Sequence, residues 1–174
     1  MKWAYLCAIP LVALAACGGG EAENKAKGKA ERLQPGQYEV TAEVTNFKAA
    51  DKGIPKINTK QGDSTTRSVC VPEGGTPPAE LFTDEAFTCR GSSDVFVRNG
   101  SINGSIDCTG TGLSGQVAYS ITGRFTEDSF EAERELKTRL TTDGDVEIAS
   151  TLRGRRTGEC SAAPAIPAAE NKAK

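Results

Sequence analysis

The sequence predicts a mainly β fold: an antiparallel meander or a partly curled sheet (a half-barrel), with one short α-helix and disordered tails. Between residues 34 and 160, apolar and polar residues alternate over several short segments, and this alternation indicates strands with one buried face. Turn-forming Gly, Asn and Asp residues divide the segments at a spacing typical of antiparallel hairpins. The same region holds four cysteines, which can staple a small core with disulfides.

The first two strands follow from this alternation. Tyr38, Val40, Ala42 and Val44 alternate with polar residues, so they predict a half-buried strand. Residues 48–63 contain Lys, Gly and Pro and predict a loop. A second strand is expected over residues 64–71.

A short α-helix is expected from residue 76 to about residue 87. Thr76 can cap such a helix, and Pro77 and Pro78 are tolerated in its first turn. Beyond Cys89 the pattern predicts strands near residues 94–98, 101–108, 116–125, 129–140 and 145–153.

Asn99-Gly100 is the strongest hairpin signal in the chain, because the favoured two-residue turns need residues that tolerate positive φ. A turn at this dipeptide places Val97 opposite Ile102. These two side chains then share one buried face.

The next hairpin turns at residues 126–129 and places Tyr119 opposite Leu136. Residues 130–140 also fit the apolar spacing of a helix, which is the alternative there. The strand is favoured because the neighbouring hairpins need a partner.

Asp143-Gly144 mark the turn of the last hairpin. A two-residue turn would put Leu140 and Val146 on opposite faces, whereas a three-residue loop aligns Leu140 with Ile148. The sequence therefore predicts a bulged turn with this register.

Four cysteines lie in the domain: Cys70, Cys89, Cys108 and Cys160. The Asn-Gly hairpin puts Cys89 and Cys108 on one face, two residues out of direct opposition, an offset that a bulge can absorb. This register selects the pair Cys89–Cys108, and elimination leaves Cys70 with Cys160. A zinc site is the alternative, but the chain has neither a Cys-x-x-Cys pair nor any His.

The N-terminal residues 1–16 have the pattern of a secretory signal, with one basic residue before a short apolar run. Leu14-Ala15-Ala16-Cys17 resembles the bacterial lipobox, in which the Cys thiol receives a diacylglyceryl group and the new N-terminus an acyl chain such as palmitate. Cys17 is therefore the expected lipidation site. Plain secretion, with Cys17 an incidental thiol, is the alternative.

Two further segments flank the domain. Residues 17–33 have a composition that does not support a core, so we expect a flexible tether between the lipid and the domain. Residues 161–174 are rich in Ala, Pro and Lys and are expected to form a disordered tail. The folded domain is therefore assigned to residues 34–160.

The composition argues against several functions. The chain has 21 Lys and Arg, 23 Asp and Glu and no His, so neither phosphate-driven nucleic-acid binding nor a His-based catalytic site is expected. Residues 110–115 match G-x-G-x-x-G, but a strand rather than a helix should follow, which predicts a loop and not a dinucleotide site. We expect no cofactor, no metal and no enzymatic activity.

The other charged residues of the strand predicted over residues 129–140 share the face that is expected to meet solvent, but Arg134 does not. The alternation places it on the inward face with Phe130, Ala132 and Leu136, where a charge requires a partner, water or a ligand anion. Arg134 is therefore a candidate residue for binding an acidic head group at the mouth of a curled sheet. The alternative is an edge position from which the side chain reaches solvent.

Four short motifs and two single cysteines, in their order along the chain, point to a family. They are Pro35-Gly36-Gln37-Tyr38-Glu39-Val40, Val69-Cys70-Val71-Pro72-Glu73, the two residues Cys89 and Cys108, Phe125-Thr126-Glu127-Asp128-Ser129-Phe130, and Arg156-Thr157-Gly158-Glu159-Cys160. Together they resemble the bacterial envelope lipoprotein family catalogued as domain of unknown function 3617. The resemblance implies export, frequent lipidation and a mainly β domain. It implies no activity, ligand or catalytic residue.

We therefore expect an exported, lipid-anchored and non-enzymatic protein of the bacterial envelope that binds a protein or surface partner. The alternative is a carrier of a small lipid or other amphiphile inside the curled sheet. Gly18, rather than Asp, follows the lipidated Cys17, which favours an anchor in the outer membrane facing the periplasm.

Overall fold

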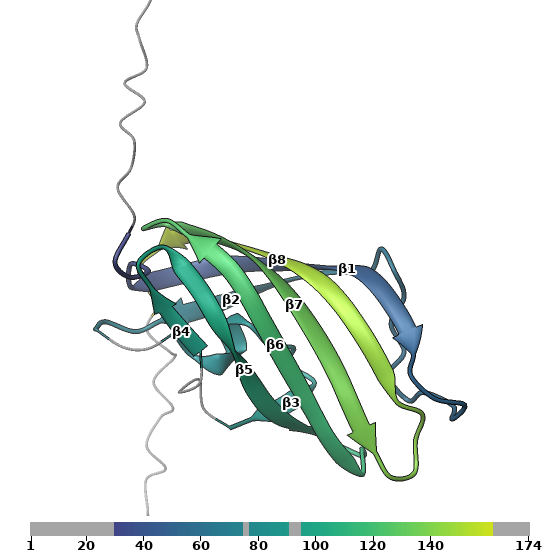
Figure 1. Ribbon diagram of the computed structural model, residues 1–174. Coiled ribbons are helices and arrows are strands. Elements are labelled where there is room, and N and C mark those ends of the chain that lie inside the picture. Colours follow the sequence, from purple (N-terminus) through teal and green to yellow (C-terminus); the bar gives the residue numbers. More distant parts are fainter. Residues whose placement is uncertain (1–29, 75–76, 91–94, 162–174) are drawn as a thin grey trace, which may run out of the picture.

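Eight strands form one antiparallel sheet in the computed structural model, which describes residues 30–74, 77–90 and 95–161. The strand order is β2-β1-β8-β7-β6-β5-β3, and β4 also pairs with β5. The strands are β1 (Gly36–Ala49), β2 (Ser64–Val71), β3 (Phe87–Cys89), β4 (Val95–Arg98), β5 (Ser101–Gly110), β6 (Gly115–Phe125), β7 (Ser129–Leu140) and β8 (Val146–Gly158). Figure 1 shows that the sheet curls into a half-barrel, with β1 and β2 crossing the direction of β5, β6 and β7.

The expected alternation produces the core. Along β6, and along β1 as far as Val44, every second side chain points to the concave face. The buried side chains include Tyr38, Val40, Val117, Tyr119 and Ile121. The opposite, convex face carries polar and charged residues. The prediction of a mainly β, partly curled sheet is therefore confirmed.

The Asn99-Gly100 hairpin has the expected register. Asn99 and Gly100 have φ values of 52° and 72°, as a two-residue turn of this hand requires. Val97 pairs with Ile102. Residues 129–140 form strand β7, not a helix, with Tyr119 opposite Leu136 as predicted.

The register predicted for the last hairpin is wrong. Leu136, not Leu140, lies opposite Ile148, so the strands are displaced from the expected pairing while the same faces stay buried. The cause is a polar bridge across the base of the loop. The Thr138 hydroxyl donates to Asp145 Oδ1 (2.9 Å) and accepts from the Val146 amide (2.8 Å), which ends the strand pairing before Leu140.

The α-helix expected over residues 76–87 is also wrong. The described part of this segment contains only a 3-10 turn, η1 (Ala79–Leu81). Leu81, Phe82 and Thr83 are buried in succession, whereas a helix lying on a sheet buries one face only. The segment instead enters the concave face as an irregular chain, and the Thr83 hydroxyl donates to the carbonyl of Ala79 (3.1 Å).

Both expected disulfides, Cys70–Cys160 and Cys89–Cys108, are present. Cys89 lies directly opposite Cys108 in the β3–β5 pairing, rather than two residues out of register. The β4–β5 pairing is offset by two residues from the β3–β5 pairing, and residues 91–94 between β3 and β4 lie outside the described residues.

The folded region begins before residue 34. Ala30 and Leu33, at the end of the expected tether, are buried in the core, and the Asn99 amide donates to the carbonyl of Glu31 (3.0 Å). The expected signal (1–16), Cys17 and most of the tail lie outside the described residues. Within the described ranges, no helix has the length and apolarity needed to cross a membrane.

Candidate ligand site

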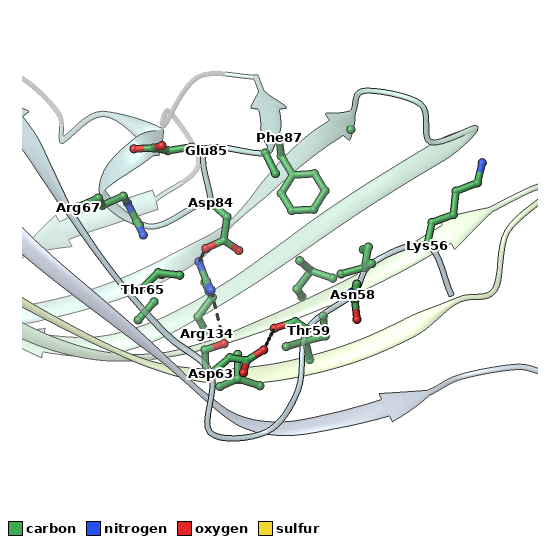
Figure 2. Close-up of a pocket in the computed structure, with 18 of the residues that line it drawn as sticks. Lys56, Asn58, Thr59, Asp63, Thr65, Arg67, Asp84, Glu85, Phe87 and Arg134 are labelled. Carbon is green, nitrogen blue, oxygen red and sulfur yellow. Dashed lines mark hydrogen bonds and ion pairs between the residues drawn. The ribbon is translucent and has the colours of Figure 1, made fainter. Parts of the chain in front are cut away.

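The concave side of the curled sheet carries a cavity of about 680 Å³ that is partly open to solvent. Strands β1, β2, β7 and β8 form its floor, and the loop after β1, the segment before β3 and the β5–β6 hairpin form its rim. Its walls are largely apolar, with contributions from Val44, Ile57, Phe87, Leu113, Leu136 and Ile148. Figure 2 shows charged side chains, among them Arg67, Asp84 and Arg134, gathered in one part of this cavity.

Arg134 lies in this cavity, on β7, with a side chain that is 4% exposed. Its Nη1 donates to Asp84 Oδ1 (2.8 Å) and to the carbonyl of Phe82 (3.3 Å), and its Nη2 donates to Ser150 Oγ (3.5 Å). The guanidinium carbon is 5.2 Å from the centre of the Tyr119 ring. The alternative in which this side chain reaches solvent from an edge is therefore wrong.

One donor of Arg134 is left over. Its Nε is buried and has no hydrogen-bond acceptor among the described residues. A buried donor without an acceptor costs free energy, about 1–3 kcal/mol. The described residues therefore do not use the full hydrogen-bonding capacity of Arg134.

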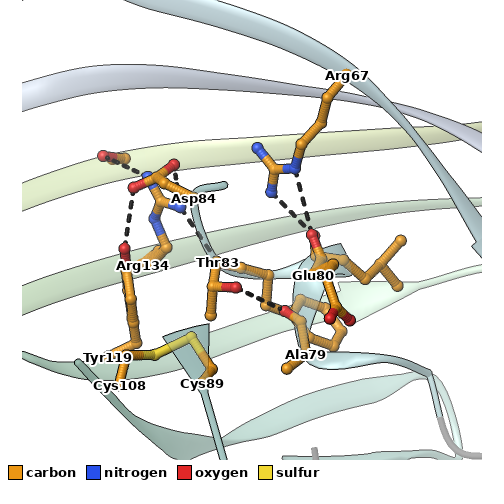
Figure 3. Close-up of polar contacts among 12 residues, drawn as sticks. Arg67, Ala79, Glu80, Thr83, Asp84, Cys89, Cys108, Tyr119 and Arg134 are labelled. Atoms are coloured by element: carbon orange, nitrogen blue, oxygen red, sulfur yellow. Dashed lines mark hydrogen bonds and ion pairs between the residues drawn. A yellow bond between two sulfur atoms is a disulfide. The ribbon is translucent and has the colours of Figure 1, made fainter. Parts of the chain in front are cut away.

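Asp84 joins Arg134 to Tyr119 (Figure 3). The Tyr119 hydroxyl donates to Asp84 Oδ2 (3.0 Å), while Oδ1 accepts from Arg134. Burial, and next the negative charge of Asp84, raise the pKa of Tyr119 above its ordinary value. The carboxylate is thus held by one cation and one phenol, and its charge is balanced within the protein.

Arg67, on β2, has a different environment. Its Nε donates to the carbonyl of Glu80 (3.2 Å) and its Nη2 to that of Leu81 (3.5 Å), which are neutral acceptors. Burial lowers the pKa of Arg67, and the negative charge of Asp84 offsets part of that effect. Within the described residues Arg67 forms no ion pair with a carboxylate.

Lys56 connects three segments at the rim of the cavity. Its Nζ lies 2.9 Å from Asp143 Oδ1, whose side chain is almost fully buried, and 3.3 Å from the carbonyl of Gly112. These contacts tie the loop after β1 to the β7–β8 and β5–β6 hairpins. Gly112 belongs to the G-x-G-x-x-G segment, which forms a hairpin turn as expected.

Of these residues, Arg134 was predicted from the sequence, whereas Arg67, Asp84 and Lys56 were not. A signal for Arg67 was available, because it has the same strand parity as the buried Val69 and Val71. Asp84 and Lys56 lie in irregular segments, where no periodicity tells which way a side chain points.

The domain cysteines are not available as metal ligands, because all four form disulfides. Across residues 30–74, 77–90 and 95–161, no group of three or more Cys, Asp or Glu side chains is placed to hold a metal ion. Of the expected site residues, the structure describes the disulfides and Arg134, whereas Cys17 lies outside it.

Comparison with known proteins places the chain by its sequence. Searches of curated proteins and of solved structures gave no match. Residues 33–160 match the family described as protein of unknown function (DUF3617), which covers the whole sheet and both disulfides. The chain therefore belongs to the DUF3617 family.

Proposed function

We propose that this protein is a lipid-anchored envelope protein that binds a small amphiphile in the cavity of its curled sheet. The observation that carries the proposal is the cavity of about 680 Å³, with apolar walls and a few charged groups gathered in one part. Pockets of roughly 300–1,000 Å³ with this division of apolar wall and polar groups are typical of small-molecule sites.

The cavity favours the carrier over a protein or surface partner. A contiguous exposed apolar patch is one mark of a docking surface for a partner. Among the described residues, the large hydrophobic side chains with high exposure are Ile54 and Phe96, and they lie on different segments, the loop after β1 and strand β4. The cavity, by contrast, gathers apolar side chains from several strands and loops in one place.

The proposed role is non-enzymatic. The charged groups nearest the centre of the cavity have structural partners, since Asp84 binds both Arg134 and Tyr119. A general acid or base has to exchange protons with a substrate, and a carboxylate held in this way is suited to stabilising the fold.

The proposed anchor is a lipidated Cys17, in the outer membrane and facing the periplasm. Each buried methylene contributes about 0.8 kcal/mol, so two or three acyl chains hold a protein on a bilayer for long periods. Two disulfides in one small domain fit an exported protein, because an oxidising compartment preserves them.

Mass spectrometry of the intact protein extracted from membranes tests the anchor. We expect the chain to start at Cys17 with added acyl mass, and to lack four hydrogens because of two disulfides. A chain that starts elsewhere, or that carries no acyl mass, contradicts the anchor and leaves the cavity proposal to its own test.

Binding of the neutral fluorescent probe N-phenyl-1-naphthylamine tests the cavity. The protein is the mature chain carrying Cys17→Ser, which removes the acyl site without touching the described residues. Val44→Trp, which adds bulk to the cavity wall, should weaken probe binding at least tenfold. Thr45→Trp, the exposed neighbour on β1, is the matched control and should bind like the parent. Equal binding by all three chains, or no binding to the parent, would refute the cavity proposal.

A further inference from the structure

The charged part of the cavity contains more positive than negative charge among its desolvated groups. Arg134 and Asp84 form an ion pair and balance each other. Arg67 is partly buried, and the groups that accept its hydrogen bonds are carbonyls of Glu80 and Leu81. Glu85 and Asp63 also line the cavity but are exposed, so water solvates their charges.

Burial has the largest influence on the electrostatics of Arg67 and lowers its pKa. The negative charge of Asp84 offsets part of this effect, whereas the positive charge of Arg134, a smaller influence, adds to it. The two guanidinium groups are therefore close enough to repel each other. An anion bound beside them would relieve the burial cost of Arg67 and the repulsion between both cations.

Arg134 supplies a second, independent observation. Its buried Nε has no acceptor among the described residues, and Arg134 lines the same cavity as Arg67. A carboxylate or phosphate head group carries only acceptor oxygens, which match donors that lack acceptors.

The opposite end of the cavity does not offer a comparable site. Figure 2 shows Arg67 and Lys56 at opposite ends, with Phe87 and Arg134 between them. Lys56 is already paired with Asp143 at 2.9 Å. Apolar residues, including Ile57, line the remaining space and suit a hydrocarbon chain.

We propose that the bound amphiphile carries an anionic head group, a carboxylate or a phosphate, and that Arg67 binds it beside the buried guanidinium of Arg134. This inference rests on the proposed function and adds the chemical class of the ligand. The apolar chain of the molecule extends from the arginines along Phe87 and Ile57 towards Lys56.

Displacement of N-phenyl-1-naphthylamine from the mature Cys17→Ser chain tests the head group. The competitors are dodecanoate, dodecyl phosphate, dodecanol and dodecyltrimethylammonium, all kept below their micellar concentrations. We expect one or both anions to displace the probe at concentrations at least tenfold lower than dodecanol, and the cation to compete least. The ratio between dodecanoate and dodecyl phosphate then distinguishes the two head groups.

Variants assign the preference to Arg67. Arg67→Met should reduce the ratio between anion and alcohol to about one, whereas Arg67→Lys, which keeps the charge, should retain part of it. Arg139→Met, an exposed arginine on β7, is the matched control and should preserve the full ratio. If Arg67→Met does not fold, the selectivity of the parent chain and of Arg67→Lys decides the question.

The outcomes separate the two proposals. If the probe binds but dodecanol competes as well as both anions, or if Arg67→Met folds and keeps the preference, the anionic head group is wrong and the cavity proposal survives. If the cation competes best, the head group has the opposite charge. If the probe does not bind at all, the proposed function itself fails.

Discussion

Asp84 Oδ1 lies 2.8 Å from Nη1 of Arg134, although 50 residues separate them in the chain. Asp84 belongs to the segment between η1 and β3, which enters the concave face of the sheet. The Cys89–Cys108 disulfide fixes the end of this segment to β5. The ion pair and the disulfide together hold an irregular segment against the sheet without the help of a helix.

Replacing Asp84 with Ala should destabilise the domain, because the buried guanidinium of Arg134 then loses its countercharge. We expect a loss of about 3 kcal/mol, the lower end of the range for breaking a buried pair, since the Asp84 side chain is 32% exposed. Urea unfolding followed by circular dichroism measures this. Asp107→Ala, at an exposed position on β5, should change the unfolding free energy by less than about 0.5 kcal/mol. Equal effects of the two substitutions would contradict the structural role of the pair.

The two disulfides should contribute unequally to stability. Cys70–Cys160 closes a sequence separation of 90 residues and Cys89–Cys108 one of 19. Loop-closure entropy then gives about 4–5 kcal/mol for the longer loop and about 3 kcal/mol for the shorter one. Unfolding of the two Cys→Ser pair variants in denaturant measures both contributions. A larger loss for the shorter loop would show that entropy of the unfolded chain does not set the order.

Gly154 should not tolerate a side chain. A Cβ at this position on β8 would overlap the ring of Phe130, its partner on β7. Gly154→Ala should therefore cost about 1–3 kcal/mol through overpacking. At Gly158, on the same strand, no atom lies within 4 Å of an added Cβ, so Gly158→Ala should stay within about 0.5 kcal/mol of the parent. Thermal unfolding of the pair checks this, and comparable melting temperatures would contradict it.

The domain should lose stability in alkali through its two tyrosines. Burial raises the pKa of Tyr38 to about 12, and that of Tyr119 is also raised. In the unfolded chain both phenols ionise near pH 10, so their contribution is fully present below pH 10 and is lost as the pH rises towards 12. Absorbance at 295 nm and circular dichroism, recorded together, should show that ionisation accompanies unfolding. Ionisation near pH 10 in a chain that stays folded would contradict the burial of both hydroxyls.

Local signals in the sequence were enough to predict much of the sheet. Asn99-Gly100 sets its own hairpin, because the turn depends on the φ values of just these two residues. Alternation alone placed Arg134 on the concave face. In the last hairpin, by contrast, the side chains of Thr138 and Asp145 determine where strand pairing stops. A hydrogen bond between two polar side chains cannot be recognised from the hydrophobic pattern.

The candidate site was harder to predict, because its parts come from distant segments. A buried Arg134 requires a partner. The sequence could not identify Asp84 as this partner, because Asp84 is 50 residues away and lies in an irregular segment. Only the curl of the complete sheet brings Arg67, on an edge strand, to the same cavity as Arg134.

The Cys70–Cys160 bond has a consequence for the time course of biosynthesis. Cys70 is on β2 and Cys160 follows β8, so the bond joins the two neighbours of β1. Residue 160 is the last of the matched family region to be made, and this cross-link therefore cannot close until every strand has been synthesised. Cys89–Cys108 can close while β6, β7 and β8 are still to come, so the earliest possible moment of oxidation differs between the two bonds.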